Sequence, residues 1–262
     1  MEINIKVVSG NHQIIAEKSG RDEVNLLFTD KYQEGDFILL ETTEKNAYLW
    51  LQFDDALGRS LVFITGPVAY QIPFGEKRLN LSSKAFCGSK HLLYARAAKE
   101  YEIKAYRNLA FNIYDQQEAI TCYPHAAANA QTRGETVFAA KNAIDGITAN
   151  ESHGEWPYQS WGINRQQDAA LRIDFGRPVA TDRIVLYTRA DFPHDNWWKM
   201  ATFVFSDGSS LKVEMEKNRL PHEFTFERKK INWVEIGNLI KSEEESPYPA
   251  LTQIEVYGFD AV

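Results

Sequence analysis

The sequence predicts an all-β protein made of two tandem antiparallel β-sandwiches of the jelly-roll type. Aromatic residues make up 13% of the 262 positions, and aromatic side chains favour strands, whose sheets pack face to face in sandwiches. Short apolar runs separated by polar turns recur along the whole chain, as they do in sandwiches and barrels. The length suffices for two domains with cores of their own, and we place them at residues 1–106 and 107–262.

The first half contains six short apolar runs that we expect to form strands. Alternation is best at residues 47–53, where Tyr48 and Trp50 would face one side and Leu49 and Leu51 the other. Residues 91–110 are ambiguous because their Ala, Lys and Glu content could also be helical, and we prefer a strand pair around a turn near Ala98. The six runs are EINIKVV, EVNLLFT, DFILLET, AYLWLQF, SLVFITG and AYQIPF.

The second half continues the pattern of strands and turns. The run LRIDFG at residues 171–176 alternates apolar and polar positions, and Asp207-Gly208 predicts a tight hairpin turn. The only convincing helix is a short, alanine-rich one at residues 135–142, and no internal repeat of a solenoid or propeller is present. The remaining expected strands lie at 183–187, 202–206, 211–217, 221–228, 231–239 and 251–259.

Charge and cysteine content exclude several classes of protein. The net charge is −7 with basic residues scattered among acids, which disfavours nucleic acid as a partner because phosphate neutralisation supplies most non-specific binding. No leader opens the chain and no run approaches the roughly 20 apolar residues of a bilayer span, so we expect a cytoplasmic protein, or a secreted one if a leader was removed. Cys87 and Cys122 fit no disulfide framework or zinc motif, and we expect small core or semi-buried side chains, with a single cross-link as the alternative.

An ordered set of short motifs in the second half carries a resemblance to a known family. RNLA at residues 107–110 is followed by NAIDG at 142–146, Trp161, LRIDFG, VLYTR at 185–189, FSDGS at 205–209 and the terminal IEVYG at 254–258. This order resembles the galactose-binding-like jelly roll of discoidin and coagulation-factor type C domains, fucose-binding lectins and related bacterial carbohydrate-binding modules. The resemblance covers roughly residues 107–262, and the first half resembles nothing with equal clarity.

The resemblance implies a calcium site at the NAIDG loop. In such modules this loop commonly wraps a calcium ion, which takes six to eight oxygen ligands. On this chain the role would fall to the Asp145 carboxylate and to backbone oxygens of Asn142 and Ile147. Gln253 stands where the family usually has a carboxylate, which predicts a weaker affinity. The alternative is that Asp145 only closes the turn by accepting backbone hydrogen bonds.

Loops expected at one end of the second sandwich combine aromatic and polar residues. A sugar presents hydroxyls that pair with Arg, Asp and Asn, and an apolar face that stacks on an aromatic ring. By resemblance, a His, an Arg, an Asn and an aromatic platform would bind the sugar, and their counterparts are His153, Arg189, Asn196 and a Trp or Tyr248. The full candidate set is His153, Trp156, Arg189, Asp191, His194, Asn196, Trp197, Trp198 and Tyr248.

Several of these residues have an equally simple structural interpretation. Trp161 is expected to be core, and of the adjacent Trp197 and Trp198 one should be buried, because neighbouring side chains point opposite ways in an extended segment. Arg189 could form an ion pair with Asp191 or Asp195 that holds the loop.

Three functions follow from these patterns. The first is non-catalytic recognition of a mono- or oligosaccharide. The second is a glycoside-cleaving enzyme or its accessory subunit, for which Glu155, Asp191 and Asp195 are candidates by position only, because cleavage needs two carboxylates at a fixed separation. The third is an interaction module for a protein or a membrane, and the acids at 243–245 disfavour the membrane. In the first half, Asp54-Asp55 could bind a cation but is typical of a turn, and His91 is expected to pack or face solvent.

Overall fold

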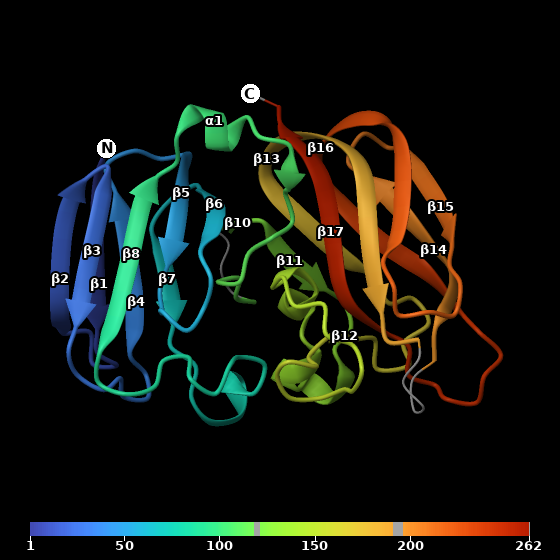
Figure 1. Ribbon diagram of the computed structural model, residues 1–262, viewed down its shortest axis with the longest axis horizontal. Helices are drawn as coiled ribbons and strands as arrows, with labels where there is room; N and C mark the ends of the chain where they lie inside the picture. The colour runs from blue at the N-terminus through green and yellow to red at the C-terminus, as the bar shows by residue number, and fades with distance from the viewer. Residues whose placement is uncertain (118–120, 191–195, 262) are drawn as a thin grey trace.

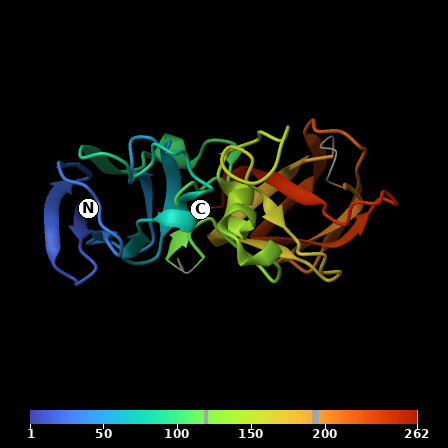
Figure 2. The same cartoon turned by 90° about the horizontal axis from the view of Figure 1, so that it is seen from below.

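The chain folds into two β-sandwiches that lie side by side along the long axis of the molecule. The computed structural model describes residues 1–117, 121–190 and 196–261, and both views show the N-terminal sandwich next to the C-terminal one (Figure 1, Figure 2). The predicted all-β class with antiparallel sheets is confirmed. None of the helices in these ranges has the length and the apolar character that crossing a bilayer requires.

The N-terminal sandwich consists of a four-stranded and a five-stranded sheet. Alternation places Ile3, Ile5 and Val7 of the first strand inside, where they are fully buried, while Asn4 and Lys6 between them are partly exposed. The first sheet has the order β2-β1-β4-β7, with β1 Glu2–Val8, β2 Ile14–Arg21, β4 Phe37–Thr42 and β7 Val68–Gln71. The second has the order β10-β6-β5-β8-β3, with β3 Glu23–Phe28, β5 Ala47–Gln52, β6 Ser60–Ile64, β8 His91–Ala97 and β10 Cys122–Tyr123.

The C-terminal sandwich is built around two long strands, β13 and β16, in a hydrogen-bonded sheet with the order β12-β17-β13-β16-β14-β15. Strand β13, Leu171–Thr188, pairs first with β11 and with the later part of β16, His222–Lys241, and then with β17, Ala250–Asp260, and the earlier part of β16. Its register shifts between Asp174 and Val179. The other strands are β9 Arg107–Asn108, β11 His125–Ala128, β12 Trp161–Gly162, β14 Trp198–Phe205 and β15 Ser210–Glu214.

A glycine makes the bend in β13 possible. Gly176 has φ of +65°, which other residues adopt only with strain. A Cβ atom there would lie 2.3 Å from the ring of Tyr123. The close approach of Tyr123 therefore requires glycine, and it brings the bend of β13 next to the strand that joins the N-terminal sheet.

Two local predictions were wrong. The helix expected at 135–142 is instead a series of short 3₁₀ helices, η2 Thr132–Gly134, η3 Thr136–Phe138 and η4 Ala140–Ile144, because Ala139 is extended and interrupts the series. The second strand expected after Ala98 is a single helical turn, α1 Glu100–Ile103. Glu102 accepts a hydrogen bond from the Lys99 amide at 2.6 Å and forms a 2.8 Å ion pair with Arg96, which stabilises the turn over an extended conformation.

The two sandwiches share a polar boundary and part of the connecting chain. Tyr114 and Cys122, which follow the expected boundary, pack in the N-terminal core. The last residues of β17 reach the N-terminal sheet, where the Tyr48 hydroxyl donates to the Asp260 carboxylate at 3.0 Å. Both cysteines are free, and Cys87 is exposed rather than semi-buried as expected. It opens an exposed stretch at residues 87–90, after the short η1 helix (Gly75–Arg78) and the buried Phe86.

Candidate functional site

A cavity of about 260 Å³ lies among loops at the end of the C-terminal sandwich where β17 begins. We call it the loop-end pocket. Five chain segments meet there: the η2–η3 region, the loop before β12, the end of β12 with the loop after it, the residue after β13, and the start of β17 with the residues before it. Its lining residues are Thr132, Arg133, Phe138, His153, Gly162, Ile163, Asn164, Arg165, Arg189, Tyr248, Pro249 and Ala250.

Tyr248 and Arg165 form one side of the loop-end pocket. The Arg165 guanidinium carbon lies 4.5 Å from the centre of the Tyr248 ring, and the guanidinium also donates a hydrogen bond to the Tyr248 hydroxyl. Asn164 and Arg165 both have positive φ, and the Asn164 amide donates to the Thr132 hydroxyl at 3.0 Å. This turn directs Arg165 toward the ring, while 38% of Tyr248 stays exposed to solvent.

The η2–η3 region adds a second arginine and a buried ring to the lining. Arg133 forms a bidentate pair with Glu135, and its guanidinium carbon lies 5.3 Å from the centre of the Phe138 ring. Phe138 is almost fully buried, so it supplies an apolar base rather than a free platform. The guanidinium of Arg133 is fixed at the rim by its acidic neighbour.

Arg189 and His153 complete the pocket from two of the predicted loops. Arg189 follows β13 directly and is only 2% exposed, and its Nη1 donates to the Tyr158 carbonyl at 3.3 Å. His153 is exposed on the lining. Among the described lining residues there is no aspartate or glutamate. The pocket therefore offers hydrogen-bond donors and aromatic surface.

Asn196 lies behind the pocket rather than in it. Its side-chain amide donates to the carbonyls of Glu244 and Ser246 at 2.9 and 2.6 Å, and its oxygen accepts from the Ser242 hydroxyl. It also forms a parallel bridge with Pro249. Asn196 is buried, and its part in this structure is to hold the loop that carries Tyr248.

The tryptophans have three different environments. Trp161 and Trp198 are buried in the core with ring centres 6.4 Å apart, as expected for Trp161 and for one of the adjacent pair. Trp197 is half-buried, and its indole N–H donates to the Glu244 carboxylate at 3.2 Å. Trp156 is 42% exposed but lies outside the loop-end pocket, with its backbone amide bonded to the Leu79 carbonyl of the N-terminal half.

The structure thus brings together three of the nine predicted sugar-site residues, His153, Arg189 and Tyr248. Asp191 and His194 lie outside the described residues, as does Asp195. Sequence reasoning missed the arginines and the asparagine that line the same pocket. The pair Asn164-Arg165, three and four positions after the expected core residue Trp161, was a signal of a polar loop. Nothing in the sequence connects Arg165 to Tyr248, 83 positions later.

The NAIDG loop is closed by its own side chains. Asp145 accepts hydrogen bonds from the Ile147 amide at 2.9 Å and from the Gln159 side chain at 2.6 Å, and Gln253 accepts from the Gly146 amide at 3.1 Å. The Asn142 side chain donates to two backbone carbonyls of this region. Burial raises the pKa of the Asp145 carboxyl to about 7, although these hydrogen bonds and the Lys141 charge act in the opposite direction.

This raised pKa predicts how stability depends on pH. The folded chain holds the Asp145 proton more tightly than the unfolded chain, whose pKa is near 3.8, so ionisation lowers the free energy of unfolding as pH rises from about 4 to 7. Between pH 5 and pH 8 the free energy of unfolding of the parent should fall by about 2–3 kcal/mol more than that of Asp145→Asn, which has no carboxyl group at this position. Urea denaturation of both proteins at the two pH values measures this difference. Equal pH dependence of the two proteins contradicts the assignment.

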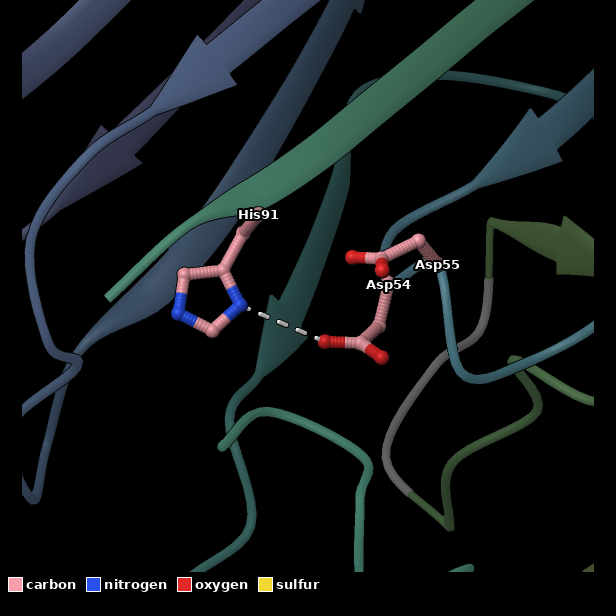
Figure 3. Close-up of side chains that lie close together, drawn as sticks. All are labelled: Asp54, Asp55 and His91. Carbon is pink, nitrogen blue, oxygen red and sulfur yellow. Dashed lines mark ion pairs between the residues drawn. The ribbon is translucent and has the colours of Figure 1, made fainter. Parts of the chain in front are cut away.

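The molecule has a second cavity and a cluster of possible metal ligands outside the loop-end pocket. A larger cavity of about 780 Å³ lies between the two halves, but Phe74 is its only aromatic lining residue among those described. In the N-terminal sandwich, Asp54, Asp55 and His91 bring their ligand atoms within 4.8 Å of one another and could hold a metal ion (Figure 3).

Fold and site together define a two-sandwich β protein with an aromatic and basic pocket at the loop end of its second sandwich. The chain belongs to the family described as a domain of unknown function (DUF7402), which it matches over residues 119–257. No curated protein sequence matches it.

Solved structures similar to the chain have names that describe binding modules. One is chitosan-binding module 1 derived from a chitosanase/glucanase of Paenibacillus sp. IK-5, at 18% identity and a TM-score of 0.41, covering 58% of this chain and 98% of that one. A Streptococcus pneumoniae fucose binding module has 11% identity, a TM-score of 0.43 and the same two coverages, 58% and 98%. The family 32 CBM of C. perfringens NanJ, in complex with galactose, has 18% identity, a TM-score of 0.39 and coverages of 50% and 91%.

Proposed function

We propose that the protein is a non-catalytic carbohydrate-binding protein and that its sugar site is the loop-end pocket. The observation that carries this proposal is the exposed Tyr248 ring held by the Arg165 guanidinium beside Asn164. A sugar ring has an apolar face that packs on an aromatic side chain and hydroxyls that accept hydrogen bonds from Arg and Asn. The pocket supplies both kinds of contact within a single cavity.

The size of the pocket indicates how much of a glycan it takes. A cavity of about 260 Å³ is smaller than the roughly 300–1,000 Å³ typical of sites for drug-sized ligands. One sugar residue at the end of a glycan fits this space better than an internal stretch of several residues. With a single stacking ring and few hydrogen bonds, we expect a dissociation constant in the micromolar to millimolar range.

Substitution of Tyr248 tests the site directly. A glycan array identifies a ligand, and calorimetric titration then compares the parent with Tyr248→Ala and Tyr248→Phe. We expect about a tenfold loss of affinity for the alanine variant, equivalent to about 1.4 kcal/mol, because the stacking surface is removed. The phenylalanine variant keeps the ring and loses only the hydroxyl that Arg165 contacts, so its loss should be smaller.

The control is Tyr101→Ala, because Tyr101 is a 74% exposed ring on α1 outside the pocket. Its affinity should equal that of the parent. Absence of any sugar ligand on the array, or equal binding by the parent and Tyr248→Ala, rejects the proposal. A loss of affinity in the Tyr101 variant as well indicates a different sugar site.

Two further assays test the other two functions, glycoside cleavage and attachment to a membrane. Glycoside cleavage needs a pair of carboxylates across the bond, and turnover of aryl glycosides by the purified protein is the result that favours it. Membrane attachment is measured by liposome co-sedimentation. The acids of the loop before Tyr248 pair with lysines, Lys199 with Glu243 and Lys217 with Glu244, which leaves little positive charge to attract an anionic surface.

For the NAIDG loop, the proposal is a turn closed by Asp145 rather than a calcium site. Both carboxylate oxygens already accept hydrogen bonds, and the Gln253 oxygen is occupied by the Gly146 amide. The loop thus offers calcium one carboxylate, which already interacts with the positive charge of Lys141, and an amide where a second carboxylate would stand. Addition of calcium at pH 8 should therefore leave the melting temperature unchanged, and a clear rise supports the calcium site instead.

A further inference from the structure

We propose that Asp54, Asp55 and His91 form a binding site for a divalent transition-metal ion of the zinc type. The two aspartates follow β5, and His91 is the first residue of β8. Figure 3 shows the two carboxylates and the imidazole turned toward a common space. Imidazole and carboxylate are ligands that zinc accepts in proteins, commonly three from the chain with a water in the fourth position.

The hydrogen bonding of His91 leaves a lone pair facing this space. Its Nε2 lies 3.3 Å from the Gly88 carbonyl, which can only accept, so Nε2 carries the proton of the neutral ring. Nδ1 is then an acceptor, and it faces Oδ2 of Asp54, another acceptor, at 3.5 Å. Either a proton, as in the ion pair drawn in Figure 3, or a metal cation can bring these two atoms together. A backbone carbonyl on the far nitrogen is also the usual partner of a metal-binding histidine.

The separation of these two atoms suits ligands of one metal ion. With metal–ligand bonds of about 2.0–2.2 Å, the edge of a zinc tetrahedron is about 3.4 Å. The 3.5 Å between Nδ1 and Oδ2 is close to this edge, and it is longer than a charge-assisted hydrogen bond of about 2.7–2.9 Å. The spacing therefore favours a shared metal ion over a shared proton.

The carboxylate of Asp54 is held in position from behind. Its Oδ1 accepts a hydrogen bond from the Ala56 amide and its Oδ2 accepts one from the Phe86 amide, both at 2.8 Å. Each carboxylate oxygen has a second lone pair that these donors do not use. Asp54 is only 2% exposed, and a bound cation would offset the cost of burying its charge.

The buried hydroxyl of Tyr32, whose ring packs on His91, is a second feature that favours a bound metal ion. Tyr32 is 5% exposed, its ring centre lies 4.4 Å from that of His91, and its Oη has no hydrogen-bond partner among the described residues. Burial, followed by the charges of Asp54, Asp36 and Asp55, raises the pKa of this phenol, so it can only serve as a neutral donor or acceptor. A water bound to the metal gives such a hydroxyl the partner that it lacks. Asp55 is exposed, which provides the entry from solvent.

Cobalt(II) is the probe for this site because its visible absorption reports four-coordinate binding. The full-length protein is treated with a chelator, dialysed and titrated with cobalt. We expect one equivalent to bind with the intense visible bands of a tetrahedral site, and zinc to abolish these bands. Asp55→Asn removes an exposed ligand without opening the core, and it should weaken the affinity at least about tenfold.

Two controls separate this site from adventitious binding. Asp168→Asn changes an exposed acid elsewhere and should bind cobalt as the parent does. Cys87→Ser removes the exposed thiol of the neighbouring loop, and it too should leave the bands unchanged. Failure to bind one equivalent, equal affinity of the parent and Asp55→Asn, or loss of the bands only in Cys87→Ser overturns the proposal. Sugar binding at the loop-end pocket does not enter this test, so the two proposals fail separately.

Discussion

Replacement of Asp260 by alanine is expected to lower the free energy of unfolding by about 3–5 kcal/mol. The Asp260 side chain is fully buried, and its two oxygens accept hydrogen bonds from Arg177 and Arg107. Arg177 is only 6% exposed and lies over the rings of Tyr48 and Phe63 in the N-terminal sheet. Removal of the carboxylate leaves a buried guanidinium without its counter-charge, which is the costly way to break an ion pair.

Guanidinium denaturation of the parent and Asp260→Ala measures this loss. The matched control is Asp182→Ala, because Asp182 also pairs with an arginine, Arg228, whose side chain is 56% exposed. An exposed pair of this kind contributes about 0–1 kcal/mol. If the two variants lose equal stability, the buried network does not stabilise the contact between the sandwiches.

The Asp260 network also shows what the sequence could not predict. Asp260 and Arg107 are 153 positions apart, and Asp260 and Tyr48 are 212 apart. Each of these residues is ordinary in its own segment, and only the folded chain places them together between the two sandwiches. This polar network stabilises the contact between the two domains. No periodicity or motif in the sequence predicts that contact.

The strands were predictable because their pattern is local. Alternation at residues 47–53 and 171–176 corresponds to β5 and to the first part of β13, and Asp207-Gly208 does turn between β14 and β15. The predicted helix failed because helix propensity of alanine was the only argument for it. Ala139 is extended in the structure, the turn before it packs Val137 and Phe138 inward, and the turn after it buries Ala143 and Ile144. Tertiary packing decided the conformation there, as it often does for short segments.

The candidate site was predictable in part for a similar reason. Aromatic and polar residues in expected loops identified His153, Arg189 and Tyr248, because loops at one end of a sandwich converge. The sequence did not reveal Arg165, whose importance depends on a positive-φ turn and on a ring distant in sequence. Asn196 was assigned to the ligand, whereas in the structure its side chain holds the loop.

The adjacent tryptophans, finally, should behave in opposite ways when each is shortened to alanine. Trp198 is 1% exposed and packs near Trp161 in the core, so Trp198→Ala should cost about 3–5 kcal/mol through lost burial and the cavity left behind. Trp197 is half-buried and bonded to the side chain of Glu244, and Trp197→Ala should cost about 1 kcal/mol. Urea denaturation of both variants measures the contrast, and equal losses contradict the core assignment.

Trp198→Phe separates a core role from a ligand role for this ring. The indole N–H of Trp198 is buried and has no hydrogen-bond partner among the described residues, so phenylalanine removes an unsatisfied polar group while it keeps most of the apolar volume. We expect this variant to lose less than half of the stability that the alanine variant loses and to keep the sugar affinity of the parent. A stable Trp198→Phe protein with strongly reduced sugar affinity contradicts this expectation, because a ring inside the core reaches a ligand only through the loops that it supports.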